Sequence, residues 1–189
     1  MERDRNVIQS VDRALDILES FEEAPGEIGV SEISRRLGIH KSTVFGLLNT
    51  LSRRGYLEKN PETGRYRLGL RAFEIGTLVL DRMDLPSLAG PILQRLVEKH
   101  EETVHLVVRD GCHVVYIAKR ESPRSMRIVS QVGRRLPCHC TGVGKALLAY
   151  LPEADLDALV RQNGLPRYTR NTITDLPTHR HTAEAITTM

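Results

Sequence analysis

The residues of this sequence whose types and spacing suit chemistry gather in the segment CHCTGVGKALLAY, residues 138–150. Two cysteines flank a histidine there, and a Gly-x-Gly-Lys follows. Cysteine and histidine side chains bind zinc, and a cysteine beside a histidine can act as a nucleophile. Glycines that precede a lysine can wrap a phosphate group. The spacing of these residues decides which of the three chemistries the segment can support.

The glycines and the lysine do not have the spacing of a nucleotide-binding P-loop. That motif, Gly-x-x-x-x-Gly-Lys-Ser/Thr, would place its first glycine at position 139, which is a histidine. Ala146 follows Lys145, so the hydroxyl group that would bind magnesium is also missing. The spacing therefore argues against the binding of a nucleoside triphosphate.

A catalytic or metal-binding role for the cysteines has weak support in the sequence. His139 is next to Cys138 and Cys140 in the chain, but catalysis needs a thiolate that lies close to a base in space. Cys112 and His113 are further candidate zinc ligands, yet as neighbours on a predicted strand they should point in opposite directions. The Cys-x-Cys pair also lacks the two-residue spacer of common zinc sites. We expect no metal and no cofactor, with zinc as the open alternative.

A helix N-terminus is the feature that this segment fits best. Thr141 is a capping residue, and apolar positions recur after it at helical spacing: Ala146, Leu147, Tyr150 and Leu151. The glycines would let a ligand approach the N–H groups of Gly142, Val143 and Gly144, and such groups favour anions. The alternative is that the glycines serve only close packing of the helix.

The composition bounds the class of protein. The 189 residues are enough for one large or two small domains, and the 40% apolar and 27% charged content suits a globular protein. Tryptophan is absent and aromatic residues make up 4%, so we expect an aliphatic core. The apolar runs are shorter than the ~20 residues of a membrane span, and the start has no signal-peptide core. We expect a cytoplasmic protein, and the three cysteines do not indicate a disulfide framework.

The charge is distributed unevenly along the first part of the chain. Residues 1–32 carry three arginines against nine acidic residues, a net charge of −6, and residues 33–71 carry nine basic against two acidic residues, a net charge of +7. A basic segment after an acidic one indicates that the second faces a polyanion. A solvated charged surface is the alternative, so a motif is needed to decide.

The first helix is predicted over residues 10–23. Its apolar positions share one helical face: Val11, Ala14, Leu15, Leu18 and Phe21. Pro25, Gly26 and Gly29 then interrupt the pattern and predict the end of the helix.

Two short helices follow, joined by a turn that contains glycine. The first has Gly29 as its N-cap, Glu32 in its first turn and Gly38 where it stops. The second starts near His40, ends at Gly55 and has a regular apolar face: Val44, Leu47, Leu48 and Leu51. This pair predicts a helix-turn-helix, whose second helix enters the DNA major groove.

A basic hairpin completes the unit. Residues 56–59 and 65–68 alternate like two strands, and the turn NPETG between them has Pro61 to fix φ and Gly64 to allow positive φ. A basic hairpin directly after a helix-turn-helix predicts a wing.

The segment LGIHKSTVFGLLNTLSRRGYLEKNPETGRYRLG, residues 37–69, resembles the winged helix of the IclR family of bacterial transcriptional regulators. Residues that open the second helix, residues on its polar face and residues of the wing are expected by their positions to contact DNA, and a solvated helix surface is the alternative for each of them. These residues are His40, Lys41, Ser42, Thr43, Asn49, Thr50, Arg53, Arg65 and Arg67. The family usually has an arginine where Gly46 stands, so we expect an altered sequence preference.

Residues 69–85 predict one helix with apolar residues on more than one side, which needs more than one packing partner. The resemblance favours an interdomain helix that also helps the chain dimerise. The alternative is a buried helix inside a single domain.

The rest of the chain predicts an α+β domain. A helix with Pro86 at its start and Ile92, Leu93, Leu96 and Val97 facing inward precedes a hairpin of residues 103–109 and 112–119, with Asp110-Gly111 as its turn. Residues 125–132 predict a third strand, and residues 152–164 a helix with Leu156, Leu159 and Val160 facing inward. Helices beside an antiparallel sheet define the α+β class.

This second part resembles the GAF-like effector-binding domain of IclR regulators. Residues 133–151 match the family segment Leu-Pro-x-His-x-Thr-x-x-Gly-Lys-Ala-Leu, with Cys138 and Gly142 as departures. The resemblance implies that an effector contacts His139, Thr141, Gly142, Val143 and Gly144. Family members usually continue for several dozen residues beyond Met189, so we expect an incomplete, truncated sensor domain that associates with itself through exposed apolar surface.

The predicted organisation is a winged helix-turn-helix over residues 1–68, a linker helix over 69–85 and a GAF-like domain over 86–189. The predicted protein is a DNA-binding transcriptional repressor, a homodimer or homotetramer on a palindromic operator, whose affinity responds to a small carboxylate effector. Two alternatives are a DNA binder without a working sensor and a small-molecule enzyme on the second domain. No paired carboxylates or nucleophile–base pair in the sequence supports the enzyme.

Overall fold

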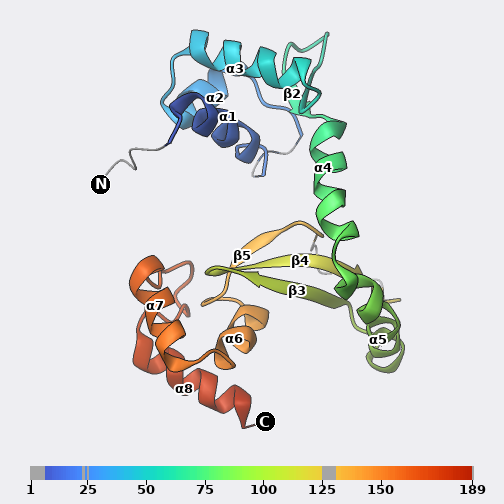
Figure 1. Ribbon diagram of the computed structural model, residues 1–189, viewed down its shortest axis with the longest axis vertical. Coiled ribbons are helices and arrows are strands. Elements are labelled where there is room, and N and C mark those ends of the chain that lie inside the picture. Colours follow the sequence, from blue (N-terminus) through green and yellow to red (C-terminus); the bar gives the residue numbers. More distant parts are fainter. Residues whose placement is uncertain (1–6, 23, 25, 125–130, 189) are drawn as a thin grey trace. The chain divides into compact units, whose positions relative to one another are not determined.

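The computed structural model describes residues 7–22, 24, 26–124 and 131–188, and the chain divides into two compact units, Met1–Arg82 and Met83–Met189 (Figure 1). The division falls inside the segment 69–85 that was expected to link two domains. Each unit has its own hydrophobic core.

The first unit holds the predicted helices and hairpin in the predicted order. Its elements are α1 (Gln9–Glu19), α2 (Val30–Leu37), α3 (Lys41–Arg53), β1 (Leu57–Lys59), β2 (Tyr66–Leu68) and α4 (Leu70–Asp81). Gly29 is the N-cap of α2, and Gly38 ends it in the left-handed conformation with φ of 65°. The helix-turn-helix is therefore confirmed, with its glycines where the sequence placed them.

Helix α1 presents a different face to the core from the one that its apolar pattern predicts. Ile17 and Phe21 are buried, whereas Val11 and Leu15 are 54% and 52% exposed. The core of this unit is built mainly on β-branched and leucine side chains: Ile17, Phe21, Ile28, Ile33, Ile39, Val44, Leu48, Leu57 and Tyr66. Leu18 also packs against this core, so the predicted face meets the core only at its C-terminal end, where Ile17, which the predicted face left out, is fully buried.

The wing is a two-stranded antiparallel sheet in which Leu57 faces Leu68 and Lys59 faces Tyr66. Ile28, in the segment before α2, forms an antiparallel bridge with Tyr66 and so adds a third segment beside β2. Gly64 has φ of 67°, as the turn requires. The predicted hairpin is confirmed.

The start of α4 is fixed against the turn that follows α3. The Gly69 N–H donates to the carbonyl oxygen of Tyr56 (2.8 Å), and the Arg71 N–H donates to that of Gly55 (3.3 Å). A Cβ atom at Gly69 would overlap the main-chain carbonyl of Gly55, so only glycine fits there.

Helix α4 is not buried against the rest of the first unit. None of its residues is buried. Its large apolar side chains are exposed on several sides: Leu70, Phe73, Ile75, Leu78 and Val79. A helix with this surface needs packing partners beyond the first unit.

The second unit is an α+β arrangement around a three-stranded antiparallel sheet of order β3-β4-β5 (Figure 1). Its elements are α5 (Asp84–His100), β3 (Val104–Asp110), β4 (His113–Arg120), β5 (Arg135–Pro137), α6 (Gly142–Ala149), α7 (Glu153–Asn163) and α8 (Leu176–Thr187). Helices α5 and α6 both pack against β3 and β4. The α+β class is confirmed.

The hairpin turn lies one residue later than predicted. Asp110 pairs with His113, so the two-residue loop is Gly111-Cys112 and not Asp110-Gly111. Gly111 has φ of 58°, and glycine at the first position of a two-residue loop is typical of a type II′ turn. The shift takes Cys112 off the strand.

Several predictions for this unit differ from the structure. In α5, Leu93 and Val97 are buried as predicted, but Ile92 and Leu96 are exposed. Most of the predicted third strand, residues 125–132, lies outside the described residues. Among the described residues, the third strand of the sheet is β5. At the end of α6, Leu147 and Leu151 pack against the core as predicted, whereas Tyr150, the C-cap, is 74% exposed.

Candidate nucleic-acid interface and ligand cavity

The first residues of α3 form an exposed, basic helix start. His40 is the N-cap, and Lys41, Ser42 and Thr43 follow with exposed side chains. The helix has no side-chain cap and no acidic residue in its first turn. The N–H groups of a helix start carry a partial positive charge, so this end is suited to a phosphate group.

One ridge of α3 points away from the core. Ser42, Gly46, Asn49 and Arg53 are spaced by three or four residues and are all exposed, whereas Val44 and Leu48 on the opposite side are buried. Thr50 is exposed beside this ridge, and its hydroxyl donates to the Gly46 carbonyl oxygen (2.9 Å). The predicted contact residues of α3 therefore share the free side of the helix.

The two wing arginines are engaged with acidic partners. The Arg65 guanidinium donates to the Glu27 carbonyl oxygen (2.8 Å) and to the Glu32 carboxylate (3.1 Å). Arg67 is paired with Glu58 across the wing (2.8 Å). Both arginines are more than 40% exposed, so these ion pairs are weak and a phosphate group can replace the carboxylates.

Glu27 anchors the tip of the wing, a role that the sequence did not reveal. Its carboxylate accepts hydrogen bonds from the Asn60 amide (2.8 Å) and the Thr63 hydroxyl (2.9 Å). These two hydrogen bonds, the Asn60 bond first, hold the pKa of Glu27 below its usual value. Asn60 also accepts from the N–H groups of Glu62 and Thr63, which closes the turn. An asparagine before Pro61 was the available sign of that turn.

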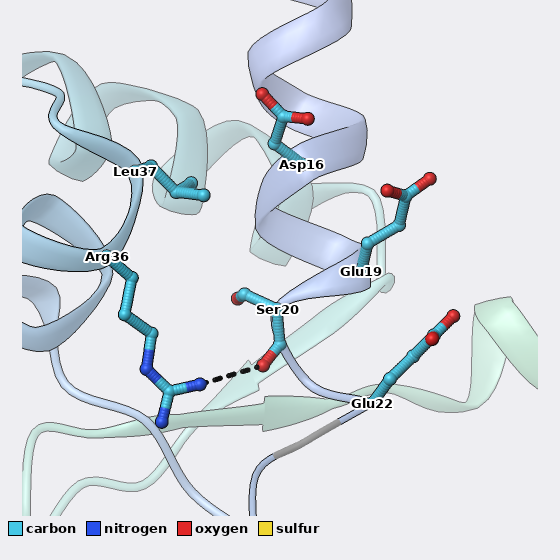
Figure 2. A pocket seen from close by; sticks show the side chains of 6 residues that line it. All are labelled: Asp16, Glu19, Ser20, Glu22, Arg36 and Leu37. Atoms are coloured by element: carbon cyan, nitrogen blue, oxygen red, sulfur yellow. Dashed lines mark hydrogen bonds between the residues drawn. The ribbon is translucent and has the colours of Figure 1, made fainter. Parts of the chain in front are cut away.

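A surface hollow beside α1 is acidic, in contrast to the basic start of α3 (Figure 2). It is lined by Asp16, Glu19, Ser20, Glu22, Arg36 and Leu37. The Arg36 guanidinium donates to the Ser20 carbonyl oxygen (3.4 Å) and pairs with Glu32 (2.8 Å). The carboxylates around this hollow would repel a phosphate backbone, so this surface is unsuited to DNA.

His139 is the predicted effector residue that lines a cavity. The side chain is 6% exposed, its Nε2 lies 2.9 Å from the Pro166 carbonyl oxygen, and its ring lies 5.8 Å from that of Tyr168. The cavity has a volume of about 210 Å³. Its wall is largely apolar and aromatic with a few polar groups: Cys112, His113, Pro137, His139, Leu159, Asn163, Gly164, Pro166 and Tyr168. This lining is typical of a small-molecule site.

The other four predicted effector residues lie at the start of α6 and do not line this cavity. Thr141 caps the helix, because its hydroxyl accepts from the Gly144 N–H (3.2 Å) and donates to the Pro137 carbonyl oxygen (2.9 Å). Gly144 is buried, and a Cβ atom there would overlap the main chain of Cys138. Val143 packs against the core and Gly142 is exposed. Gly144 thus serves close packing.

Cys112 and His113 do not point in opposite directions, so that prediction was wrong. The Cys112 Sγ lies 3.2 Å from the His113 Nδ1, because Cys112 belongs to the turn and not to the strand. Both side chains line the cavity of His139 and an adjoining hollow of about 490 Å³. Within the described part of the chain, no group of three or more His, Cys, Asp or Glu residues is placed to hold a metal ion.

A winged helix-turn-helix that is followed by an antiparallel-sheet α+β unit is the architecture of a class of bacterial transcriptional regulators. Residues 10–61 match the model of the IclR helix-turn-helix domain, and residues 77–187 match that of the bacterial transcriptional regulator IclR C-terminal. The chain belongs to the IclR family of bacterial transcriptional regulators.

The chain is also similar in sequence to individual transcriptional regulators. The chain is 44% identical over 154 residues to the HTH-type transcriptional regulator XynR of Escherichia coli, a match covering 82% of this chain and 61% of XynR. It is 37% identical over 169 residues to the HTH-type transcriptional repressor AllR of Klebsiella pneumoniae, covering 89% of this chain and 62% of AllR. The match therefore spans less than two thirds of either relative.

Among solved structures, an IclR homolog from Microbacterium hydrocarbonoxydans complexed with 4-hydroxybenzoate superposes with a TM-score of 0.75 and 26% identity. The match covers 95% of this chain and 74% of that chain. No helix among the described residues combines the length and the apolar character that crossing a membrane requires.

Proposed function

We propose that this protein is a sequence-specific, DNA-binding transcriptional repressor that acts in the cytoplasm. The observation that carries the proposal is the exposed ridge of α3, Ser42, Gly46, Asn49 and Arg53, behind a basic helix start without acidic residues. Such a helix fits the major groove, with its first residues at base edges and phosphates. The similarity to AllR, which is named a repressor, supports repression as the outcome of binding.

The proposed DNA-binding form is a homodimer, or a homotetramer made of two dimers, on a palindromic operator. The exposed apolar residues of α4 support this proposal, because a second copy would cover them. Two copies related by a two-fold axis would read half-sites about 34–36 Å apart, or a multiple of that distance.

Operator binding at several salt concentrations tests the DNA-binding proposal. Operators would be selected from a random duplex library, and affinity measured by fluorescence anisotropy. The logarithm of the association constant should fall linearly with the logarithm of salt concentration. Lys41→Ala should weaken binding and reduce that slope by about 0.9, the value for one lost phosphate contact. Arg95→Ala, an exposed change on α5, is the control of equal charge and should leave both quantities unchanged.

We also propose that a small carboxylate effector binds the second unit and changes operator affinity. The cavity beside His139 suits a small carboxylate. Its aromatic and apolar wall would hold the carbon skeleton, and His113 and Asn163 offer polar contacts. The exposed amide of Gly142 and that of Val143 are a second place for the carboxylate, at the start of α6. That a relative is complexed with 4-hydroxybenzoate supports this class of ligand.

A thermal-shift screen of small acids, with 4-hydroxybenzoate included, tests the effector proposal. A ligand at 100 times its dissociation constant should stabilise the protein by about 2.7 kcal/mol. His139→Gln should reduce the shift if the cavity is the site, and Gly142→Ala should reduce it if the helix start is the site. Operator binding that responds to no acid in the screen would instead favour a DNA binder without a working sensor.

A further inference from the structure

Phe45 is the large apolar residue of α3 that lies outside the core. The other large apolar residues of this helix are buried in the core of the first unit or pack against it: Val44, Leu47, Leu48 and Leu51. Phe45 does not belong to that core, and its side chain is 47% exposed. An aromatic side chain in this position forgoes the favourable burial of its apolar surface. The packing of the first unit therefore gives no reason for a phenylalanine at position 45.

Phe45 lies on the surface that α3 offers to DNA. A helix brings residues three and four positions apart to the same side, so Phe45 is a neighbour of Lys41, Ser42 and Asn49, which are all exposed. Side chains of a helix lean toward its N-terminus, so the ring of Phe45 lies over the first turn of α3. In a helix-turn-helix, the N-terminal residues of the second helix contact the base edges. Phe45 therefore lies where bases are read.

The surface next to Phe45 is open on the side of Gly46. A Cβ atom at Gly46 would meet nothing within 4 Å. Thr50, one turn further along, has its hydroxyl engaged with the Gly46 carbonyl oxygen (2.9 Å). A base edge can therefore approach the ring of Phe45 without displacing a long side chain from position 46.

The charges around the ring fit a nucleic acid. Helix α3 carries no acidic residue, and the ammonium group of Lys41 lies one turn before Phe45. A basic and neutral surface of this kind attracts a polyanion. The apolar patch that it surrounds then faces the bases and not a phosphate group.

Thymine has the chemistry that matches an apolar side chain in the major groove. Each base offers a distinct set of groups there, and the methyl group at C5 of thymine is the apolar one. Against the amino group of cytosine or the carbonyl oxygen of guanine, a phenyl ring would leave a polar group without a hydrogen-bond partner. Contact with the ring therefore favours thymine over the other bases.

We propose that Phe45 is a specificity-determining residue whose ring packs against the 5-methyl group of a thymine in each half-site of the operator. The inference rests on the proposed function, because it requires α3 to lie in the major groove. It assigns a base preference to a residue that forms no hydrogen bond and meets no phosphate. Its effect on affinity should therefore be independent of salt.

Replacing thymine by deoxyuridine tests the contact directly. Deoxyuridine lacks only the 5-methyl group and keeps the same base pair with adenine. The thymines in one half-site of the operator selected from the random library are replaced one at a time, and affinity is measured by fluorescence anisotropy. We expect one thymine at which the replacement weakens binding of the wild-type protein by about fourfold, the usual effect of one buried methyl group. Phe45→Ala should bind the two versions of that operator equally, since the ring that meets the methyl group is gone.

Variants at position 45 separate this contact from a phosphate contact. Phe45→Ala should bind the unmodified operator about four- to tenfold more weakly than wild type, and the slope of its salt dependence should be unchanged. Phe45→Leu keeps an apolar side chain and should retain part of the discrimination between thymine and deoxyuridine. Because Phe45 lies outside the core, thermal unfolding of Phe45→Ala should match that of wild type. Tyr150→Ala, which removes a 74% exposed aromatic side chain from the end of α6, is the matched control and should behave as wild type throughout.

The outcomes distinguish this inference from the proposed function. A selected operator without thymine in its half-sites, an affinity that no deoxyuridine replacement changes, or a fourfold effect that persists in Phe45→Ala would each overturn the role of Phe45. Each of these results leaves DNA binding by α3 intact. Wild-type protein that binds no duplex from the library would instead overturn the proposed function, and the role of Phe45 with it.

Discussion

The Asn60 side-chain amide donates a hydrogen bond to the Glu27 carboxylate, with 2.8 Å between Nδ2 and Oε1. These residues are separated by 33 positions, and the bond ties the tip of the wing to the segment before α2. The same segment supplies the carbonyl oxygen that holds Arg65. Glu27 thus holds the tip of the wing against the helix-turn-helix, next to the main-chain bridge between Ile28 and Tyr66.

Replacing Glu27 by alanine should loosen the wing and weaken operator binding. The variant loses the hydrogen bonds of Asn60 and Thr63, so we expect a loss of about three- to tenfold in affinity. Fluorescence anisotropy with the selected operator measures it. Glu27→Gln keeps an acceptor for one partner and should recover part of the affinity. Equal affinity of Glu27→Ala and wild type would show that the wing does not depend on this anchor.

Gly46 should be the position at which the DNA preference of this protein can be changed. A Cβ atom at Gly46 meets nothing within 4 Å, and the residue lies in the middle of the exposed ridge of α3. Gly46→Ala should stabilise the protein by up to about 1 kcal/mol in thermal unfolding.

Gly46→Arg, the residue usual in the family, should change the selected operator sequence and make the salt dependence steeper by about 0.9 if it meets a phosphate. The alanine variant is the control for helix propensity. An unchanged operator preference and affinity in Gly46→Arg would refute this role for Gly46.

The two glycines at the start of α6 should respond differently to alanine. In Gly144→Ala the new methyl group overlaps the main chain of Cys138, so we expect a loss of about 1–3 kcal/mol in the free energy of unfolding. Gly142 is exposed and has open space around it, so Gly142→Ala should leave stability nearly unchanged. Chemical denaturation of both variants measures this. Equal losses of stability in the two variants would show that close packing is not the reason for a glycine at position 144.

His179 should make the stability of the second unit sensitive to acid. The side chain is 1% exposed, and within the described residues neither ring nitrogen has a hydrogen-bond partner. Burial first, and then the charges of His139 and Lys145, lower its pKa from the usual 6.5. The unfolded chain therefore binds a proton that the folded chain does not, so the stability present above pH 6.5 is lost as the pH falls below it. The slope can reach about 1.4 kcal/mol per pH unit.

His179→Leu should remove this acid sensitivity and stabilise the protein by about 1–3 kcal/mol, since a buried polar group without a partner is lost. His181→Leu, two residues along α8 and 87% exposed, is the matched control and should keep the acid sensitivity. Thermal unfolding between pH 5 and 8 measures both variants. A pH dependence that survives in His179→Leu would assign the effect to another group.

The helix-turn-helix and the wing could be predicted because their signals are local. Gly38 and Gly64 take positive φ angles at the turns where the sequence placed them, and Val44 and Leu48 recur at helical spacing toward the core. Because Val44 and Leu48 face the core, the proposed contact residues on the other side of α3 could be predicted to be exposed. Local signals of this kind survive in any tertiary context.

The second unit was harder to predict because its short elements depend on partners far away in the chain. Strand β5 has three residues and exists through its pairing with β4. Helix α8 has a weak apolar pattern, although Asp175 as its N-cap and Pro177 in its first turn were readable signs. The position of Glu27 under the wing and the contact of Cys112 with His113 depend on register and turn geometry, which spacing alone does not fix.

The packing of Gly69 on Gly55 has a mechanical consequence. The main-chain hydrogen bonds of Gly69 and Arg71 hold the first turn of α4 against the turn that follows α3. There is no room for a side chain at Gly69 between the two segments. A rotation of the first turn of α4 should therefore displace the turn that follows α3, and with it the end of the helix that carries the exposed ridge.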